Sequence, residues 1–160
     1  MKSVLFICIG NCCRSQMAEG FARSLGKDML KAASAGLSPT LTVSEDTIAA
    51  MAEVGIDIND QFPKEFDYRL AASYDIIVNM SGFDLPPMET ALVTEWKVTD
   101  PYYEPMAVFR EVRDEIERRV RNLIADVERN GTVTEDLVGQ RIASKQTRKP
   151  GLWQRFTAWR

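Results

Sequence analysis

The sequence contains no histidine among its 160 residues. Without imidazole, a Ser/His/Asp or Cys/His catalytic arrangement and a histidine-based metal site are both excluded. Only three cysteines are present, Cys8, Cys12 and Cys13, which are too few and too crowded for a disulfide framework or a zinc site. We therefore expect no metal and no cofactor, and this cysteine usage favours a reducing cytoplasm as the location.

Long apolar runs are also missing from the sequence. The apolar run near residue 5 is short, is interrupted at Arg14 and is followed by no Ala-x-Ala cleavage pattern, so no signal peptide is expected. No stretch is long enough to span a membrane. A chain of 160 residues fits one domain of ordinary size, which we expect to bury about two-thirds of its unfolded surface.

The most informative segment follows the apolar run at residues 4–7. Residues 8–15 read Cys-Ile-Gly-Asn-Cys-Cys-Arg-Ser. A strand that runs through such a loop into a helix directs backbone N–H groups inward and forms an oxyanion site. Cys8 opens this loop and Arg14 closes it, where the helix N-terminus and the guanidinium favour a thiolate. We predict that Cys8 is a nucleophile and that the planar fork of Arg14 holds two oxygens of the oxyanion.

The remaining loop residues are expected to shape this phosphate-binding site. Gly10 permits a positive φ, Asn11 ties the loop internally, and Ser15 donates a hydrogen bond to the Cys8 sulfur. The predicted phosphate-binding set is Ile9, Gly10, Asn11, Cys12, Cys13 and Ser15. A non-catalytic oxyanion-binding module is an alternative, but such a module has no need of a thiol.

Apolar runs alternate with helical patterns along the chain, which predicts a three-layer α/β/α fold with a parallel sheet. The pattern predicts strands at 4–8, 31–34, 75–80 and, more weakly, 96–98, and helices at 14–25, from a Ser44 cap to before Gly55, and from 106 to about 129.

The loop at residues 8–15 resembles the low-molecular-weight protein tyrosine phosphatases and the related thioredoxin-coupled arsenate reductases. Four further segments agree with that family in the same order: 15–20, 34–36, 54–58 and 100–103. The resemblance spans roughly residues 1–129 and implies a four-stranded sheet in the flavodoxin-like order 2-1-3-4, with the loop at the carboxyl ends of the strands. We expect a catalytic domain at 1–131 and a C-terminal extension at 132–160.

The resemblance also implies roles outside the loop. Asp100, stiffened by Pro101, becomes the proton donor to the leaving oxygen. Tyr102 and Tyr103 either form a rim that contacts an aromatic leaving group or pack as wedges against the last helix. Cys13 matches the position whose thiol forms a reversible disulfide with the nucleophile. Cys12 is interpreted as a small loop residue without redox function.

Two enzymatic activities fit this set. The main prediction is a phosphomonoester hydrolase that forms a cysteinyl-phosphate, with a phosphotyrosine protein or a small aryl phosphate as substrate. The Asp100–Tyr103 segment favours it, although residues 37–43 offer no aromatic pocket wall. The alternative is arsenate reduction. Residues 79–84 contain no cysteine, so a reductase would need an external low-molecular-weight thiol.

The C-terminal segment has a different composition from the rest of the chain. Residues 140–160 carry six basic and no acidic side chains, whereas residues 1–139 have a net charge of −9. Trp153, Phe156 and Trp159 recur every third residue beside arginines. We expect this segment to dock on the acidic body of the same or a neighbouring subunit. An anionic membrane surface and a nucleic acid are less favoured partners.

Overall fold

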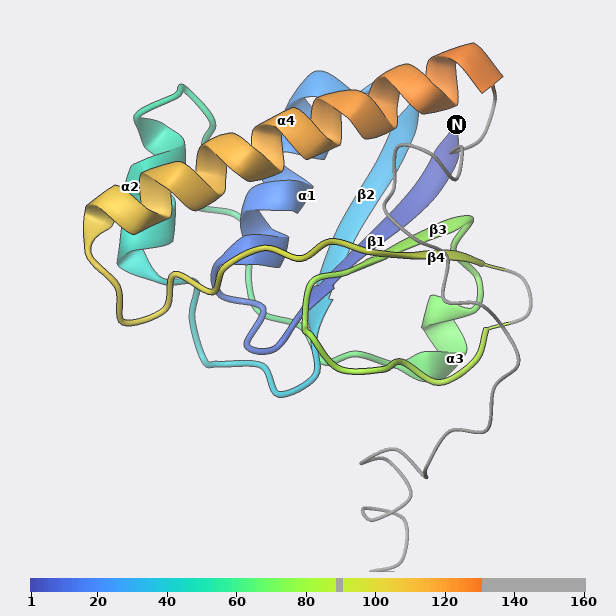
Figure 1. The fold of residues 1–160 in the computed structure, drawn as a ribbon, viewed down its shortest axis with the longest axis horizontal. Helices are drawn as coiled ribbons and strands as arrows, with labels where there is room; N and C mark the ends of the chain where they lie inside the picture. The colour runs from blue at the N-terminus through green and yellow to red at the C-terminus, as the bar shows by residue number, and fades with distance from the viewer. Residues whose placement is uncertain (89–90, 131–160) are drawn as a thin grey trace, which may run out of the picture.

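The fold is a parallel sheet with helices on both faces (Figure 1). The computed structural model describes residues 1–88 and 91–130. The predicted docking of the segment at 132–160 lies outside these residues. The described elements are β1 (Lys2–Cys8), α1 (Arg14–Leu25), β2 (Leu30–Gly36), α2 (Glu45–Ala52), α3 (Tyr68–Ala71), β3 (Ile76–Asn79), β4 (Leu92–Glu95) and α4 (Met106–Asn130).

The sheet has the order β2-β1-β3-β4, and all three pairings are parallel. This confirms the predicted order 2-1-3-4. At the centre of the sheet, Phe6 of β1 lies opposite Ser34 of β2 and Val78 of β3. Because the strands are parallel, their carboxyl ends meet at one edge, and the loop at residues 8–15 leaves the sheet there.

Alternate residues of β1 serve the two faces of the sheet. Val4 and Phe6 belong to the larger core beneath α1 and α4, whereas Leu5 and Ile7 pack on the opposite side with Ala71 of α3. Burial of each large apolar side chain stabilises the fold by roughly 2 kcal/mol. The two cores fix β1 on both sides and so fix the point at which Cys8 leaves the sheet.

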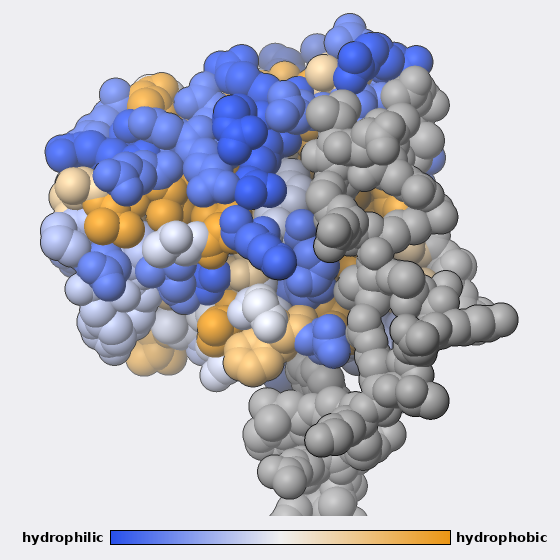
Figure 2. Space-filling model, in the orientation of Figure 1, coloured by the Kyte–Doolittle hydropathy of each residue, from blue (hydrophilic) through white to orange (hydrophobic). Residues whose placement is uncertain are grey.

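The longest helix, α4, is one-sided as its sequence pattern predicts. Its buried apolar positions are Phe109, Val112, Ile116, Val120, Leu123 and Val127. Ion pairs on its outer face join Glu115 to Arg119 and Glu117 to Arg121, each at 2.7 Å. Hydrophilic side chains accordingly gather along this part of the surface (Figure 2). Within the described part of the chain, no helix combines the length and apolarity that crossing a bilayer requires.

The structure corrects three sequence-based expectations. The fourth strand lies at 92–95 and not at 96–98. Trp96 and Val98 are apolar because they pack in the core beneath α4, and not because they belong to a strand. The short helix α3 was not predicted. It is only four residues long, and its N-terminus is set by Asp67, which accepts a hydrogen bond from the Arg69 N–H at 2.8 Å. Ser44 does stand at the N-cap of α2, but its side chain makes no capping hydrogen bond.

Candidate active site

The loop at residues 8–15 is braced from outside by the segment that follows β2. Backbone N–H groups of Leu37, Ser38, Thr40 and Ser44 donate to the loop carbonyls of Cys8, Ile9, Gly10 and Cys12, at 2.9 to 3.1 Å. With its carbonyls engaged outward, the loop can present N–H groups inward. The N–H of Asn11 does so and donates to Cys8 Sγ at 3.2 Å.

Close backbone approach sets the shape of the loop. Asn11, and not Gly10, adopts the positive φ of 48° that we expected at the glycine. Asparagine tolerates this left-handed conformation better than most residues do. Gly10 is needed for space, since a Cβ there would lie 3.1 Å from Cys12 Sγ. Gly36 has the same role on β2, where an added Cβ would lie 2.8 Å from Asn11 Cβ.

Cys8 lies at the floor of the site, and its side chain is buried. Its Sγ is 2.9 Å from Ser15 Oγ. Burial is the largest influence on this thiol and raises its pKa, while the Ser15 hydrogen bonds, the charge of Arg14 and the Asn11 N–H act in the opposite direction. Burial and these polar contacts act in opposite directions on the thiol, and the thiolate of Cys8 stays a prediction.

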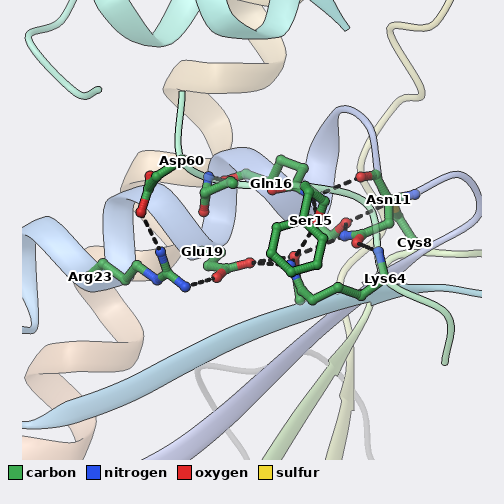
Figure 3. A network of polar contacts seen from close by, with 11 residues as sticks. Cys8, Asn11, Ser15, Gln16, Glu19, Arg23, Asp60 and Lys64 are labelled. Atoms are coloured by element: carbon green, nitrogen blue, oxygen red, sulfur yellow. Dashed lines mark hydrogen bonds and ion pairs between the residues drawn. The ribbon is translucent and has the colours of Figure 1, made fainter. Parts of the chain in front are cut away.

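Behind Cys8 lies a buried chain of hydrogen bonds (Figure 3). The Glu19 carboxylate can only accept, and it takes the hydroxyl hydrogen of Ser34. Asn11 Nδ2 then donates to Ser34 Oγ at 2.8 Å and to Ser15 Oγ at 2.7 Å. The one hydrogen of the Ser15 hydroxyl is then free to point at Cys8 Sγ, and a Cys8 thiolate can only accept it. The chain thus suits Ser15 to donate to a thiolate.

Charges from two directions hold Glu19 in place. Its side chain is fully buried and pairs with Arg23 at 2.5 Å and with Lys64 Nζ at 3.4 Å. The Lys64 backbone N–H also donates to Asn11 Oδ1 at 2.7 Å, which fixes the orientation of that amide. Sequence reasoning did not assign a role to Glu19, Ser34 or Lys64. The available signal was for Glu19, a glutamate that stands among the apolar positions of a helix that faces the core.

Arg14 closes the loop with most of its donors already engaged. Its side chain is buried, and Nη1 donates to the carbonyl oxygens of Met80 at 2.7 Å and Val98 at 3.3 Å. Nη2 pairs with Asp100 Oδ2 at 2.5 Å. Among the described residues, Nε has no hydrogen-bond partner. A buried donor without a partner beside Cys8 is suited to a bound oxyanion.

These groups surround a pocket of about 160 Å³. Its lining comprises Cys8, Ile9, Gly10, Cys12, Cys13, Arg14, Ser38, Thr40, Asp100 and Tyr102. Most of the predicted site residues are therefore brought together, while Asn11 and Ser15 lie behind the lining. Ser38 and Thr40 were not predicted, and they form a polar wall where an aromatic side chain is absent.

The two tyrosines differ in their positions. Tyr102 lines the pocket, and Tyr103 stands against its ring, with the centroids 4.2 Å apart, but is 93% exposed. Such exposure rules out packing of Tyr103 against the last helix. Asp100 lies at the pocket mouth, with 43% of its side chain exposed. Within the described ranges, no group of three or more Cys, Asp or Glu side chains is arranged to hold a metal ion.

Comparison with known proteins places this site in a family. Residues 3–133 match the family described as low molecular weight phosphotyrosine protein phosphatase. A glutaredoxin arsenate reductase from Synechocystis sp. is 40% identical over 131 residues, which cover 79% of this chain and 99% of that protein. An arsenate reductase from Staphylococcus aureus is 37% identical and covers 76% and 95%, respectively.

Solved structures agree with this placement. An arsenate reductase in the phosphate binding state has a TM-score of 0.72 and 41% identity, covering 79% of this chain and 99% of that one. A tyrosine phosphatase from Erwinia amylovora shares the fold, with a TM-score of 0.68 at 24% identity, covering 76% and 90%. The chain therefore belongs to the low molecular weight phosphotyrosine protein phosphatase family.

Proposed function

We propose that this protein is an arsenate reductase in which Cys8 attacks arsenate and an external thiol completes the reduction. The observation that carries the proposal is that Arg14, whose Nε has no partner among the described residues, lines the same small pocket of about 160 Å³ as Cys8. This space suits a small tetrahedral oxyanion. Ser38 and Thr40 form a polar wall of the pocket, and relatives at 40% and 37% identity are named arsenate reductases.

In the first step, the oxyanion binds to the loop and to Arg14. Because burial raises the pKa of Cys8, the thiol loses its proton on binding, and the basic arsenate dianion is the acceptor within the site. The Cys8 sulfur then attacks arsenic and a water molecule leaves, which gives a thioester of pentavalent arsenic. The Ser15 hydroxyl stabilises the charge on the sulfur before attack.

In the second step, a thiol from outside the chain attacks the Cys8 sulfur. A disulfide forms between that thiol and Cys8, the sulfur–arsenic bond breaks, and its electron pair reduces arsenic to the trivalent state. A second thiol then releases Cys8 and carries away the disulfide. External thiols are invoked because residues 79–84, which follow the third strand, contain no cysteine that could relay the disulfide. By analogy with the Synechocystis relative, we propose a glutaredoxin-linked thiol as the donor.

Phosphomonoester hydrolysis is a second candidate, supported by the position of Asp100. Its carboxyl lies in the pocket lining next to Tyr102, where it can protonate the leaving oxygen of an ester. A water molecule, activated by the same carboxylate, would then hydrolyse the cysteinyl-phosphate. In both candidates, we propose residues 1–131 as the catalytic domain.

A paired assay tests these proposals. Aryl phosphate hydrolysis and arsenate reduction are measured for the wild type and Cys8→Ser, with glutathione plus glutaredoxin, mycothiol or thioredoxin as electron donors. We expect arsenite formation with the glutathione system and its loss in Cys8→Ser, by at least about 10⁴-fold. Hydrolysis without any arsenate reduction would replace the first candidate by the second. Phosphate binding without hydrolysis and without arsenate reduction would mean that the protein is a non-catalytic binding module.

A further inference from the structure

Two thiols in the pocket take no part in the mechanism above. Cys12 and Cys13 are both free, both line the pocket, and their sulfur atoms are 3.6 Å apart. Their side chains are buried apart from this opening. Cys12 Sγ is held between the position of Gly10 and the side chain of Thr40. The pair is therefore preorganised, since its neighbours leave the two sulfurs side by side.

The contact between the two sulfurs also shifts their pKa values in opposite directions. It is the largest influence on Cys12 and lowers its pKa to about 7. The same contact, together with burial, raises the pKa of Cys13. Because the thiolate is the form of cysteine that binds soft ions, the shift at Cys12 favours a soft ligand.

We propose that Cys12 and Cys13 form a chelating site for trivalent arsenic. Two sulfurs bound to one atom at about 2.3 Å, the length of a zinc–thiolate bond, lie about 3.5 to 3.8 Å apart. The observed separation of 3.6 Å already meets this requirement. Soft thiolate ligands select soft, thiophilic centres, and trivalent arsenic is one. This proposal rests on the proposed function, because its ligand, arsenite, is the product that the proposed reduction releases in this same pocket.

The binding step is a ligand exchange without any change of oxidation state. The Cys12 sulfur bonds to arsenic and displaces one hydroxide from arsenous acid, and the Cys13 sulfur displaces a second. Two arsenic–sulfur bonds form and two arsenic–oxygen bonds break, and each displaced hydroxide leaves as water with a proton from a thiol or from the solvent. The bound arsenic then occupies the space of the oxyanion, so arsenite inhibits the enzyme by competing with arsenate.

The test uses the full-length reduced protein and arsenite alone. After incubation and desalting, bound arsenic is measured by elemental analysis and by intact-protein mass. We expect one arsenic per chain in the wild type and in Cys8→Ser. Cys12→Ser and Cys13→Ser should bind about 100-fold more weakly, because a single sulfur loses the chelate advantage. Loss of arsenic in Cys8→Ser, or undiminished affinity in either of the other variants, overturns the proposal.

A second measurement on the wild type does not depend on variants that fold poorly. Arsenite should protect Cys12 and Cys13 together from alkylation, as peptide mapping by mass spectrometry would show. Protection of Cys8 with only one of its neighbours would contradict the proposed pair. Because neither measurement requires turnover, arsenite binding can be found even where arsenate reduction is absent. The failure of one proposal is thereby separated from the failure of the other.

Discussion

The side chains on the two sides of Cys8 differ in how completely hydrogen bonds fix their positions. Behind the sulfur, Ser15, Asn11 and Glu19 are buried and joined by hydrogen bonds that leave a single direction for each hydrogen. In front of it, Nε of Arg14 has no partner within the described part of the chain, and Asp100 is partly exposed at the pocket mouth. From this difference we propose that the rear prepares the sulfur, whereas the front selects the substrate and the leaving group.

The largest effect is expected at the front, from Arg14→Lys. Lysine keeps the charge but loses the planar fork that reaches two carbonyls, Asp100 and the oxyanion at the same time. We expect kcat/KM for either substrate to fall by about 10³-fold, with phosphate binding weakened as well. Steady-state kinetics and phosphate titration check this. Turnover within tenfold of the wild type would show that charge alone suffices at this position.

The next effect separates the two candidate reactions. Asp100→Asn removes the proton donor but keeps a polar side chain of equal size. Aryl phosphate hydrolysis should fall by about 10²-fold or more, because an alkoxide or phenoxide leaves poorly without general acid catalysis. Arsenate reduction should change by only a few-fold, since the oxygen that leaves arsenic departs as water. Equal losses in both assays would assign Asp100 a role in positioning Arg14 and not in proton transfer.

The same two sides show what a sequence can reveal. The front was predicted from sequence because Cys8 and Arg14 belong to one short pattern and Asp100 lies in a segment that resembles the family. The rear was largely missed, since Glu19 and Lys64 lie 45 positions apart and meet only after folding. No local pattern records that contact.

Errors in the fold have a similar origin. The buried strands and long helices were predicted because their periodicity reflects burial. Trp96 was assigned to a strand because it is apolar, but its burial results from packing, with its ring 5.9 Å from that of Phe6. The pKa of Cys8 could not be inferred either, because it depends on how deeply the sulfur is buried.

At the rear, Glu19→Gln tests whether the hydrogen-bond direction affects the sulfur. A glutamine can donate to Ser34, so Asn11 and Ser15 are no longer held in one arrangement. The Ser15 hydrogen bond lowers the Cys8 pKa, and its weakening should raise that pKa further. We expect about a tenfold slower alkylation of Cys8 at neutral pH, with the pH profile displaced to higher pH. An unchanged pH profile of alkylation would show that the hydrogen bonds behind Cys8 have only a structural role.

The smallest effect on activity is expected from Glu53→Gln, the matched control for Glu19→Gln. Glu53 also pairs with two cations, Arg110 at 2.7 Å and Arg113 at 2.9 Å, but it joins α2 to α4 and does not contact the buried chain behind Cys8. Turnover and the alkylation profile should stay within twofold of the wild type. A loss as large as that of Glu19→Gln would mean that general destabilisation, and not hydrogen-bond direction, explains both variants.

The effect of Glu53→Gln itself can be measured through the pH dependence of the protein's stability. The hydrogen bond from Arg110 is the largest influence on Glu53, and the arginines lower its pKa to about 2 from an ordinary value of 4.5. Because the folded pKa lies below the unfolded one, the carboxylate stabilises the protein above pH 4.5, and this contribution is lost as the pH falls toward 2. The wild type should therefore melt slightly higher than Glu53→Gln at neutral pH, with a difference that disappears in acid. A difference that persists in acid would mean that the stabilisation does not come from the charge of Glu53.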